Sequence, residues 1–366
     1  MFIWEQPDWP AWQFEVGTLA MSLAKVRHAQ GRLLGRMQAL GFALRDQATL
    51  AALTADVLNT SEIEGLPLNP DAVRSSLARR LGVEIGALTH TDRHIEGIVE
   101  IVLDATHRFD TPLTRKRLFG WHAALFPTGY SGLNKIRTGS WRDDADGAMQ
   151  VVSGPIGRQK VHYQAPPAHR LRTEMTAFLT WFNREQALDP VIKAGLAHLW
   201  FVTIHPFDDG NGRIARAIGD MGLARSEKTA QRFYSLSAQI QRERREYYDL
   251  LETTQRGKMN VTAWLAWFLA CLGRAIDEAD GLLEQVLMKA QFWERCAGVP
   301  LNARQIKLIN KLLDGFDGKL SSAKWAVIAK CSGDTALRDI NDLIARNLLQ
   351  KSASGGRSSR YELLLK

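Results

Sequence analysis

The sequence predicts a mostly α-helical protein in which one β-hairpin projects from the helical body and a smaller helical unit follows. Apolar residues recur at three- and four-residue spacing through most of the chain, which is helical periodicity. Few stretches alternate with a period of two, so extensive β-sheet is excluded. The exception is 137–167, where glycines and prolines surround two β-prone runs, Met149 to Val152 and Lys160 to Tyr163. This pattern predicts a hairpin flap.

The first 45 residues predict a Trp-rich arm followed by a helix. Prolines make a long helix improbable around Trp4, Trp9 and Trp12, so we expect an extended arm whose indoles pack on the body. A stacking platform for nucleobases is the alternative. Residues 46–297 are the expected main domain. Helical patterning covers 15–43, 46–59, 69–81, 92–108, 114–125, 170–185, 189–204, 211–226, 230–256 and 258–297.

Beyond Val299 and Pro300 the pattern changes. We expect helices over 302–315 and 321–331, a third helix capped by Asp334 and ending near Arg346, and then two strands around a Gly/Ser turn. This order is that of a winged helix-turn-helix over 300–366. The segment carries 12 Lys and Arg against 6 Asp and Glu, so most of the net charge of +8 lies here.

Composition excludes some classes of protein and selects none. Hydrophobic residues make up 45% of the chain and charged residues 23%, typical of a globular protein. No uninterrupted apolar run approaches the roughly 20 residues of a membrane span, and the N-terminus lacks a secretory signal, so we expect a cytoplasmic protein without a membrane segment. Three widely spaced cysteines argue against a disulfide framework. A basic balance permits contact with nucleotides, nucleic acid or acidic partners.

The segment from His205 to Arg216, HPFDDGNGRIAR, gathers groups suited to phosphate chemistry. Pro206 ends the preceding helix, which leaves the His205 imidazole on a loop. Gly210 and Gly212 allow the backbone to bend and to approach a ligand closely. A helix that starts near Asn211 directs its free N–H groups at this bend, which forms an anion site suited to a di- or triphosphate.

Charged side chains complete this constellation. Arg213 adds positive charge, and Arg216 lies on the same helix face one turn further. Asp209 supplies a carboxylate where a hard cation such as Mg²⁺ would bridge phosphate oxygens. His205 is the nearby group whose ordinary pKa suits proton abstraction at neutral pH.

The same segment resembles the HxFx(D/E)GNGRxxR signature of the Fic (filamentation induced by cAMP) domain family at every specified position. The resemblance implies the Fic helical fold, ATP as donor, Mg²⁺, and transfer of AMP to protein Ser, Thr or Tyr. It implies that His205 deprotonates the target hydroxyl, that Asp209 binds the metal and that Arg216 clamps the γ-phosphate. The implied ATP-binding residues are Val151, Val152, Ser153, Gly154, Asp209, Gly210, Asn211, Gly212, Arg213, Ile214, Ala215, Arg216, Tyr247 and Gln255.

Two further stretches fit the resemblance. In the family, the backbone corresponding to Val151 to Gly154 clamps the nucleotide and pairs with an incoming target strand, so target proteins are expected to dock on the flap 137–167. The stretch RREYYDLLETTQ resembles the family's adenine-binding segment, which places Tyr247 and Gln255 at the base. Many members have Asn at the position of Gln255. The alternative for Tyr247 and Tyr248 is ordinary helix packing.

Upstream, TSEIEG at 60–65 matches the family's (S/T)xxxE(G/N) inhibitory motif. It places Glu64 at the end of a helix near 56–65, with Gly65 as the stop. A carboxylate there could pair with Arg216 and occupy the arginine that the γ-phosphate needs. The resemblance is therefore to self-inhibited members with an N-terminal inhibitory helix.

Two other functions stay open from the sequence. An enzyme of the same fold could remove AMP or transfer another phosphate-containing group. A DNA-binding regulator would instead use the C-terminal segment. Thr335, Arg338 and Asn341 would face a groove if 334–346 is the recognition helix, and Arg357 and Arg360 would lie on the wing. The identity of the target, self-modification and a homodimer also stay open.

Overall fold

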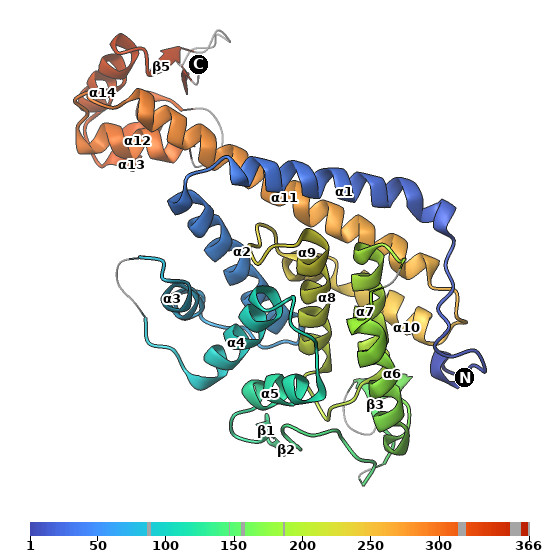
Figure 1. Ribbon diagram of the computed structural model, residues 1–366. Helices are drawn as coiled ribbons and strands as arrows, with labels where there is room; N and C mark the ends of the chain where they lie inside the picture. The colour runs from blue at the N-terminus through green and yellow to red at the C-terminus, as the bar shows by residue number, and fades with distance from the viewer. Residues whose placement is uncertain are drawn as a thin grey trace. The chain divides into compact units, whose positions relative to one another are not determined.

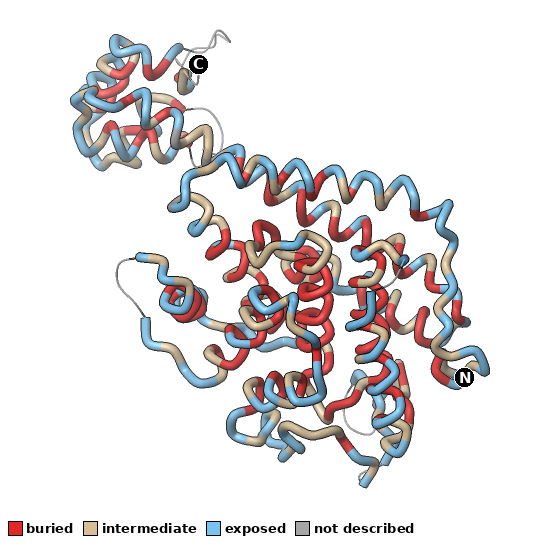
Figure 2. The backbone as a smooth tube through the Cα atoms, viewed as in Figure 1, coloured by how far each residue is buried: buried red, intermediate tan, exposed pale blue. Residues whose placement is uncertain are grey.

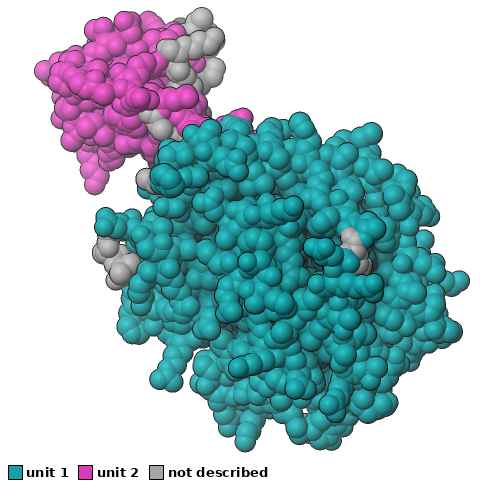
Figure 3. Space-filling view, in the orientation of Figure 1, with its two compact units in different colours: residues 1–279 teal, residues 280–366 magenta. Residues whose placement is uncertain are grey.

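The computed structural model describes residues 1–85, 89–145, 147–154, 158–185, 187–313, 320–351 and 360–364. The chain divides into two compact units, 1–279 and 280–366 (Figure 3). Among the described residues, no helix combines the length and the apolar character that crossing a membrane requires.

The first unit is helical, as predicted (Figure 1). Three predicted segments differ clearly from the structure. The helix expected over 15–43 ends at Gln38, the one expected over 46–59 extends from 42 to 63, and the one expected over 230–256 is two helices. The helices are α1 (Val16–Gln38), α2 (Phe42–Ile63), α3 (Pro70–Leu81), α4 (Arg93–His107), α5 (Arg115–Leu125), α6 (Leu171–Asn183), α7 (Pro190–Ile204), α8 (Asn211–Glu227), α9 (Leu236–Arg242), α10 (Arg244–Gln255) and α11 (Thr262–Arg295), with short 3₁₀ turns at Ile3–Glu5 and Ala168–Arg170.

A tertiary contact explains the shorter helix α9. The Ser235 side chain caps α9 by accepting a hydrogen bond from the backbone N–H of Ala238. The same hydroxyl donates to Asp56 Oδ1 on α2, which also accepts from the backbone N–H of Ser237. This contact accounts for the start of α9 at Leu236, after the expected start at 230, because local periodicity carries no information about Asp56. The prediction of one helix over 230–256 was wrong, since a second break falls at Glu243.

Helices α7 and α8 lie side by side at the centre of the unit, where Figure 2 shows them almost entirely buried. α7 is apolar on all its faces, which is typical of a fully buried helix. Small residues let α7 and α8 approach closely, since a Cβ at Gly222 would lie 2.8 Å from the Cβ of Ala194. The loop 205–210 joins α7 to α8 at one end of this buried pair.

The predicted flap is confirmed as a hairpin. Strands β3 (Gln150–Ser153) and β4 (Lys160–Gln164) pair antiparallel, with Val151 opposite Tyr163 and a bulge between Val151 and Val152. A second small hairpin, β1 (Tyr130–Ser131) with β2 (Asn134–Lys135), was not predicted. Its strands are too short to alternate visibly, and only the glycine at 132, with φ 58°, marks its turn.

The N-terminal arm packs on the body through its indoles, as expected. Trp4 Nε1 donates to the carbonyl of Gln164, and Trp9 Nε1 donates to Glu174 Oε2, at 2.7 and 2.8 Å. Trp9 and Trp12 also contact each other and Trp200 edge-on. The indoles of the arm thus take part in packing on the body.

The second unit has its own apolar core, which includes Leu308, Trp325 and Ile340. Phe292 near the end of α11 and Cys296 just after it belong to this core, so the compact unit begins before the expected boundary at 300. Its elements are α12 (Ala303–Leu313), α13 (Ser322–Ala329), α14 (Gly333–Ala345), β5 (Leu349–Lys351) and β6 (Tyr361–Leu363), the last two antiparallel.

The third helix of this unit begins earlier than predicted. The side chain of Ser332, not that of Asp334, caps α14, because its oxygen accepts from the backbone N–H of Thr335. Asp334 lies in the first turn, where a carboxylate favours the helix dipole. Arg357 falls outside the described residues.

Candidate active site

His205 lies at the C-terminal end of α7 in a left-handed conformation, with φ 51° and ψ 58°. Its Nδ1 lies 3.1 Å from the carbonyl oxygen of Val202, which can only accept, so Nδ1 carries the proton and Nε2 keeps a free lone pair. Burial lowers the pKa of His205 below its ordinary value. The imidazole is therefore neutral at neutral pH and able to accept a proton.

The His205 loop is held by Arg142, which the sequence analysis did not single out. The buried guanidinium of Arg142 donates to the carbonyl of His205 at 2.8 Å and to the carbonyl of Pro166 at 2.5 Å. It also forms an ion pair with Asp144, and its backbone N–H donates to the carbonyl of Pro206. Arg142 thus fixes the loop to both ends of the flap region.

The glycine turn leads directly into α8, which begins at Asn211. Gly210 has φ 81°, and a Cβ there would lie 2.9 Å from the ring of Phe126, so the position requires glycine. The side chain of Asn211 closes the loop: its amide donates to the carbonyl of Phe207 and its oxygen accepts from the Phe207 N–H. The first-turn N–H groups of α8 stay available for an anion.

His122 on α5 packs against the loop 205–210, and the sequence analysis did not single it out either. Its ring stacks on Phe207, with centroids 4.1 Å apart and planes 4° apart. Nδ1 accepts from the backbone N–H of Gly139 at 3.2 Å, so Nε2 carries the proton and donates to the carbonyl of Asp209 at 3.1 Å. Burial lowers the pKa of His122 to about 4, which keeps the ring neutral in this arrangement.

Asp209 presents its carboxylate at the open side of the turn, with the side chain 44% exposed. Oδ1 accepts from the N–H of Gly210 and Oδ2 from the hydroxyl of Ser131 on the small hairpin. A single exposed carboxylate beside an anion cradle suits Mg²⁺, which is commonly held by one or two carboxylates together with substrate phosphates and water. The donor set therefore fits the predicted metal role of Asp209.

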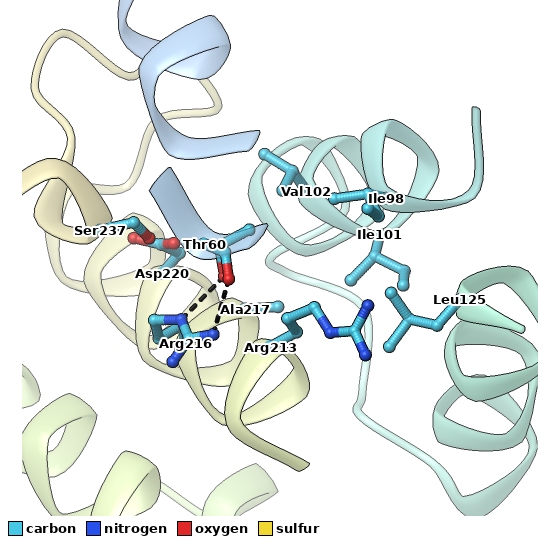
Figure 4. A pocket seen from close by; sticks show the side chains of 10 residues that line it. All are labelled: Thr60, Ile98, Ile101, Val102, Leu125, Arg213, Arg216, Ala217, Asp220 and Ser237. Carbon is cyan, nitrogen blue, oxygen red and sulfur yellow. Dashed lines mark hydrogen bonds between the residues drawn. The ribbon is translucent and has the colours of Figure 1, made fainter. Parts of the chain in front are cut away.

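Arg213 and Arg216 leave α8 one turn apart, Arg213 toward Leu125 and Arg216 toward Thr60 (Figure 4). Both are buried, and Arg213 lies over the ring of Phe126, 5.1 Å from its centroid, and 3.9 Å from Asp209 Oδ2. The hollow between them measures about 10 Å³, room for one water molecule and not for a phosphate. A nucleotide would thus bind on the open side of the turn.

Glu64 occupies part of that open side. Its Oε1 accepts from Arg216 Nη2 at 2.7 Å, and a Cβ at Gly212 would lie 2.2 Å from the same oxygen. Arg216 also donates twice to Thr60, to the hydroxyl and to the carbonyl, both at 2.8 Å. Burial opposes its charge, but the carboxylate of Glu64 raises the pKa of Arg216 above its ordinary value. The contact predicted between Glu64 and Arg216 is present.

The residues expected at the adenine lie deeper than that role suggests. Tyr247 is 1% exposed, bonds His198 Nε2 through its hydroxyl and packs on Trp264 and Trp267. Gln255 is 4% exposed, and its amide lies 3.4 Å from the hydroxyl of Thr203. Both side chains take part in the packing of α10 in this conformation, so their contact with a base stays a prediction.

The other predicted ATP-binding residues are either buried in α8 or lie on the flap. Ile214 and Ala215 are fully buried in α8 and can contribute only backbone and packing. Val152, Ser153 and Gly154 are exposed on the flap, and Val151 is half-buried. The flap loop 155–157 lies outside the described residues.

The groups that sequence reasoning missed are Arg142, His122 and Ser131. Each acts through backbone carbonyls or a neighbouring side chain far away in the sequence. Nothing in the spacing of SWRDD or of GWHAAL marks them. Only a structure brings them to the loop.

The fold and the site together describe a helical protein with a neutral histidine on the loop that leads into the N-terminus of α8. Residues 112–223 match the Fic/DOC family, so the chain carries a Fic/DOC domain, as the signature indicated. Residues 2–83 match a domain of unknown function, DUF4172.

Curated relatives carry the same domain. The chain is 32% identical over 132 residues to "Protein adenylyltransferase Fic" of Culex quinquefasciatus, and 33% identical over 115 residues to the protein of the same name from Nematostella vectensis. These matches cover 35% and 31% of this chain, and 25% of the length of each relative.

Solved structures share the fold. A Fic family protein from Desulfovibrio desulfuricans G20 aligns over 94% of this chain and 96% of its own, at 20% identity and a TM-score of 0.54. A form of Fic-1 from C. elegans aligns over 73% of this chain and 74% of its own, at 19% identity and a TM-score of 0.50.

The neutral state of His122 predicts an acid-sensitive fold. Its pKa is about 4 in the folded protein against the ordinary 6.5, so the unfolded chain binds the proton more readily. Stability is fully present above pH 6.5 and falls as the pH drops toward 4, by about 3 kcal/mol from this group. We expect His122→Gln to make the pH dependence of the unfolding free energy shallower, measured by urea denaturation from pH 7 to pH 4.

The matched control is His90→Gln, which changes an exposed histidine and should leave the slope unchanged. An identical slope in His122→Gln and in the unsubstituted protein would contradict the assignment of the neutral ring.

Proposed function

We propose that the protein transfers AMP from ATP to hydroxyl groups of other proteins. The observation that carries the proposal is the protonation state of His205: Nδ1–H is committed to the carbonyl of Val202, so Nε2 is a free base beside the glycine turn of α8. The names of the curated relatives, all adenylyltransferases, support the same reaction.

In the proposed reaction the phosphates bind at the N-terminus of α8. Backbone N–H groups of its first turn and the guanidinium groups of Arg213 and Arg216 stabilise their negative charge. Nε2 of His205 accepts the proton of a Ser, Thr or Tyr hydroxyl, whose oxygen attacks the α-phosphorus, and pyrophosphate leaves. His122 and Arg142 hold the loop that carries this base, so positioning is their contribution.

Mg²⁺, when bound, would offset the charge of the phosphates, and Asp209 would hold it. Ser131 and the N–H of Gly210 orient the Asp209 carboxylate through hydrogen bonds to its two oxygens.

The acceptor segment is proposed to dock on the flap. Strand β3 is one of the two edges of the hairpin, and its first residue, Gln150, lines a groove of about 430 Å³. An extended peptide can add to such an edge. The groove is lined by residues of both charges and by apolar ones, among them Lys135, Ile136, Arg137, Met149, Gln150 and Asp208.

Self-inhibition through Glu64 is part of the proposal. The Glu64 carboxylate accepts one hydrogen bond from Arg216, and its Oε1 would lie 2.2 Å from a Cβ at Gly212. A γ-phosphate that needs Arg216 would have to displace Glu64. The alternatives of AMP removal, of transfer of another group and of a homodimer stay open, and a cytoplasmic location stays a prediction.

We expect His205→Ala to lower AMP transfer by about 10²- to 10⁴-fold, because the variant lacks the base. The measurement is incubation with ATP and a bacterial lysate, followed by mass spectrometry of hydroxyl side chains carrying a 5′-AMP adduct. His169→Ala, which removes an exposed histidine, is the control and should retain transfer.

Undiminished transfer in His205→Ala would refute the base assignment. An adduct of different mass in the unsubstituted protein would favour another transferred group.

We expect Glu64→Gly to raise auto-AMPylation by about tenfold to a hundredfold, the factor expected from losing one charge-assisted hydrogen bond that competes with ATP. Labelled ATP and gel autoradiography measure it. Glu62→Gly is the matched control, because it removes an exposed carboxylate two residues earlier. Equal labelling of the two variants would exclude the inhibitory role of Glu64.

A second candidate function is DNA binding by the C-terminal unit. The order of α12, α13, α14 and the β5–β6 pair fits a winged helix, and α14 exposes Arg338 and Asn341. Thr335 is less available, since its hydroxyl bonds Ser332 within the helix cap.

If this unit binds duplex DNA, Arg338→Ala should weaken binding about tenfold at low salt, measured by fluorescence anisotropy at several salt concentrations. Lys311→Ala on α12 controls for the loss of one positive charge. Absence of duplex binding by the unsubstituted protein at low salt would eliminate this function.

A further inference from the structure

The first twelve residues, here called the arm, lie against the flap strand β4. Figure 1 places the N-terminus near α6, α10 and the flap. The indole N–H of Trp4 donates to the carbonyl of Gln164, the last residue of β4, at 2.7 Å. Trp4 is 9% exposed and forms a small core with Tyr163 and Ala165, against which Phe2, Met149 and Val151 pack. The arm therefore contacts both strands of the flap.

A second group covers the rest of β4. Arg256, which follows α10, donates to the carbonyls of His162 at 3.0 Å and of Val161 at 2.7 Å. Its guanidinium also lies 5.3 Å from the ring of Phe2, which joins this cap to the arm. Three backbone acceptors of β4 are thus taken by side chains of the arm and of Arg256.

Strand β3 has no corresponding cap. Within the described part of the chain, no side chain donates to a backbone carbonyl of residues 150–153. An edge strand whose backbone groups are covered cannot pair with another segment, whereas an uncovered edge can. The caps on β4 leave β3 as the strand to which an extended segment can add.

The flap is also connected to the base. The hydroxyl of Tyr163 donates to the carbonyl of Thr203 at 2.6 Å, two residues before His205. Phe2 packs edge-on against the Tyr163 ring, with centroids 5.3 Å apart. The arm therefore packs against the residue that joins the flap to the end of α7.

We propose that the arm is a positioning element for the acceptor, with Trp4 as its main residue: it caps β4, directs an extended acceptor segment to β3 and fixes the distance of that segment from His205. The selection of the acceptor edge rests on the proposed AMP transfer, whereas the capping of β4 does not.

The test compares two Trp-to-Phe variants of the arm. Trp4→Phe keeps an aromatic ring and loses the N–H that bonds Gln164. Trp12→Phe loses an indole N–H that has no partner among the described residues, so it is the matched control. We expect backbone amides of 158–164 to exchange hydrogen about fivefold faster in Trp4→Phe and at the unsubstituted rate in Trp12→Phe.

The second measurement uses ATP and, as acceptor, an unstructured seven-residue peptide with a central threonine among valines. We expect Trp4→Phe to raise the KM for the peptide about fivefold while the KM for ATP is unchanged. A purely structural loss would instead lower stability and change both constants.

Unchanged exchange in Trp4→Phe, or equal acceleration in both variants, overturns the proposal. A KM for the peptide that does not rise overturns its acceptor part. If the unsubstituted protein transfers no AMP to any acceptor, the proposed function fails, and the exchange comparison alone decides whether the arm holds the flap.

Discussion

The buried guanidinium of Arg142 is the contact on which the arrangement of the site depends. It joins the carbonyl of His205 to that of Pro166 and pairs with Asp144, whose carboxylate also accepts from the N–H of Ala168. A buried charge is costly unless it is paired and hydrogen-bonded. Loss of one partner of Arg142 would therefore destabilise the whole set of contacts. The loop that carries the base and the segment that carries the flap are consequently held as one structure, and the left-handed backbone of His205 is maintained by that restraint.

The region of unknown function, residues 2–83, reaches the site from two directions. Its arm contacts the flap through Trp4, and its helix α2 contacts the cradle through Thr60 and Glu64. Asp56 on the same helix holds the start of α9. Each of these contacts joins residues 2–83 to the segment that matches the Fic/DOC family, so the proposed acceptor edge and the proposed nucleotide site both touch this region.

Helices and the flap could be predicted from the sequence because their signals are local: apolar spacing, a proline after His205, and glycines around the turn. The same holds for the constellation His205, Asp209 and Arg216, which lies within twelve residues. What could not be predicted depends on distant partners. Asp56 holds the cap residue Ser235 at the start of α9, and the stacking of His122 on Phe207 requires α5 to pack against a loop that lies far away in the sequence. Tyr247 also shows a limit of the sequence. Its resemblance to the family's adenine-binding segment does not reveal that its ring packs against Trp264 and Trp267.

The oxygen Oε1 of Glu64 restricts which residue can stand at position 212. A Cβ at this position would lie 2.2 Å from Glu64 Oε1, so the Glu64–Arg216 contact leaves room only for hydrogen there. The proposed approach of this backbone to phosphate oxygens makes the same demand. Carboxylate and phosphate are both anions drawn to the same helix terminus, and they cannot be accommodated together. Under the proposed self-inhibition, the Glu64 carboxylate would act as a tethered phosphate analogue at high local concentration. The strength of that inhibition would then depend on how easily α2 can withdraw its last turn.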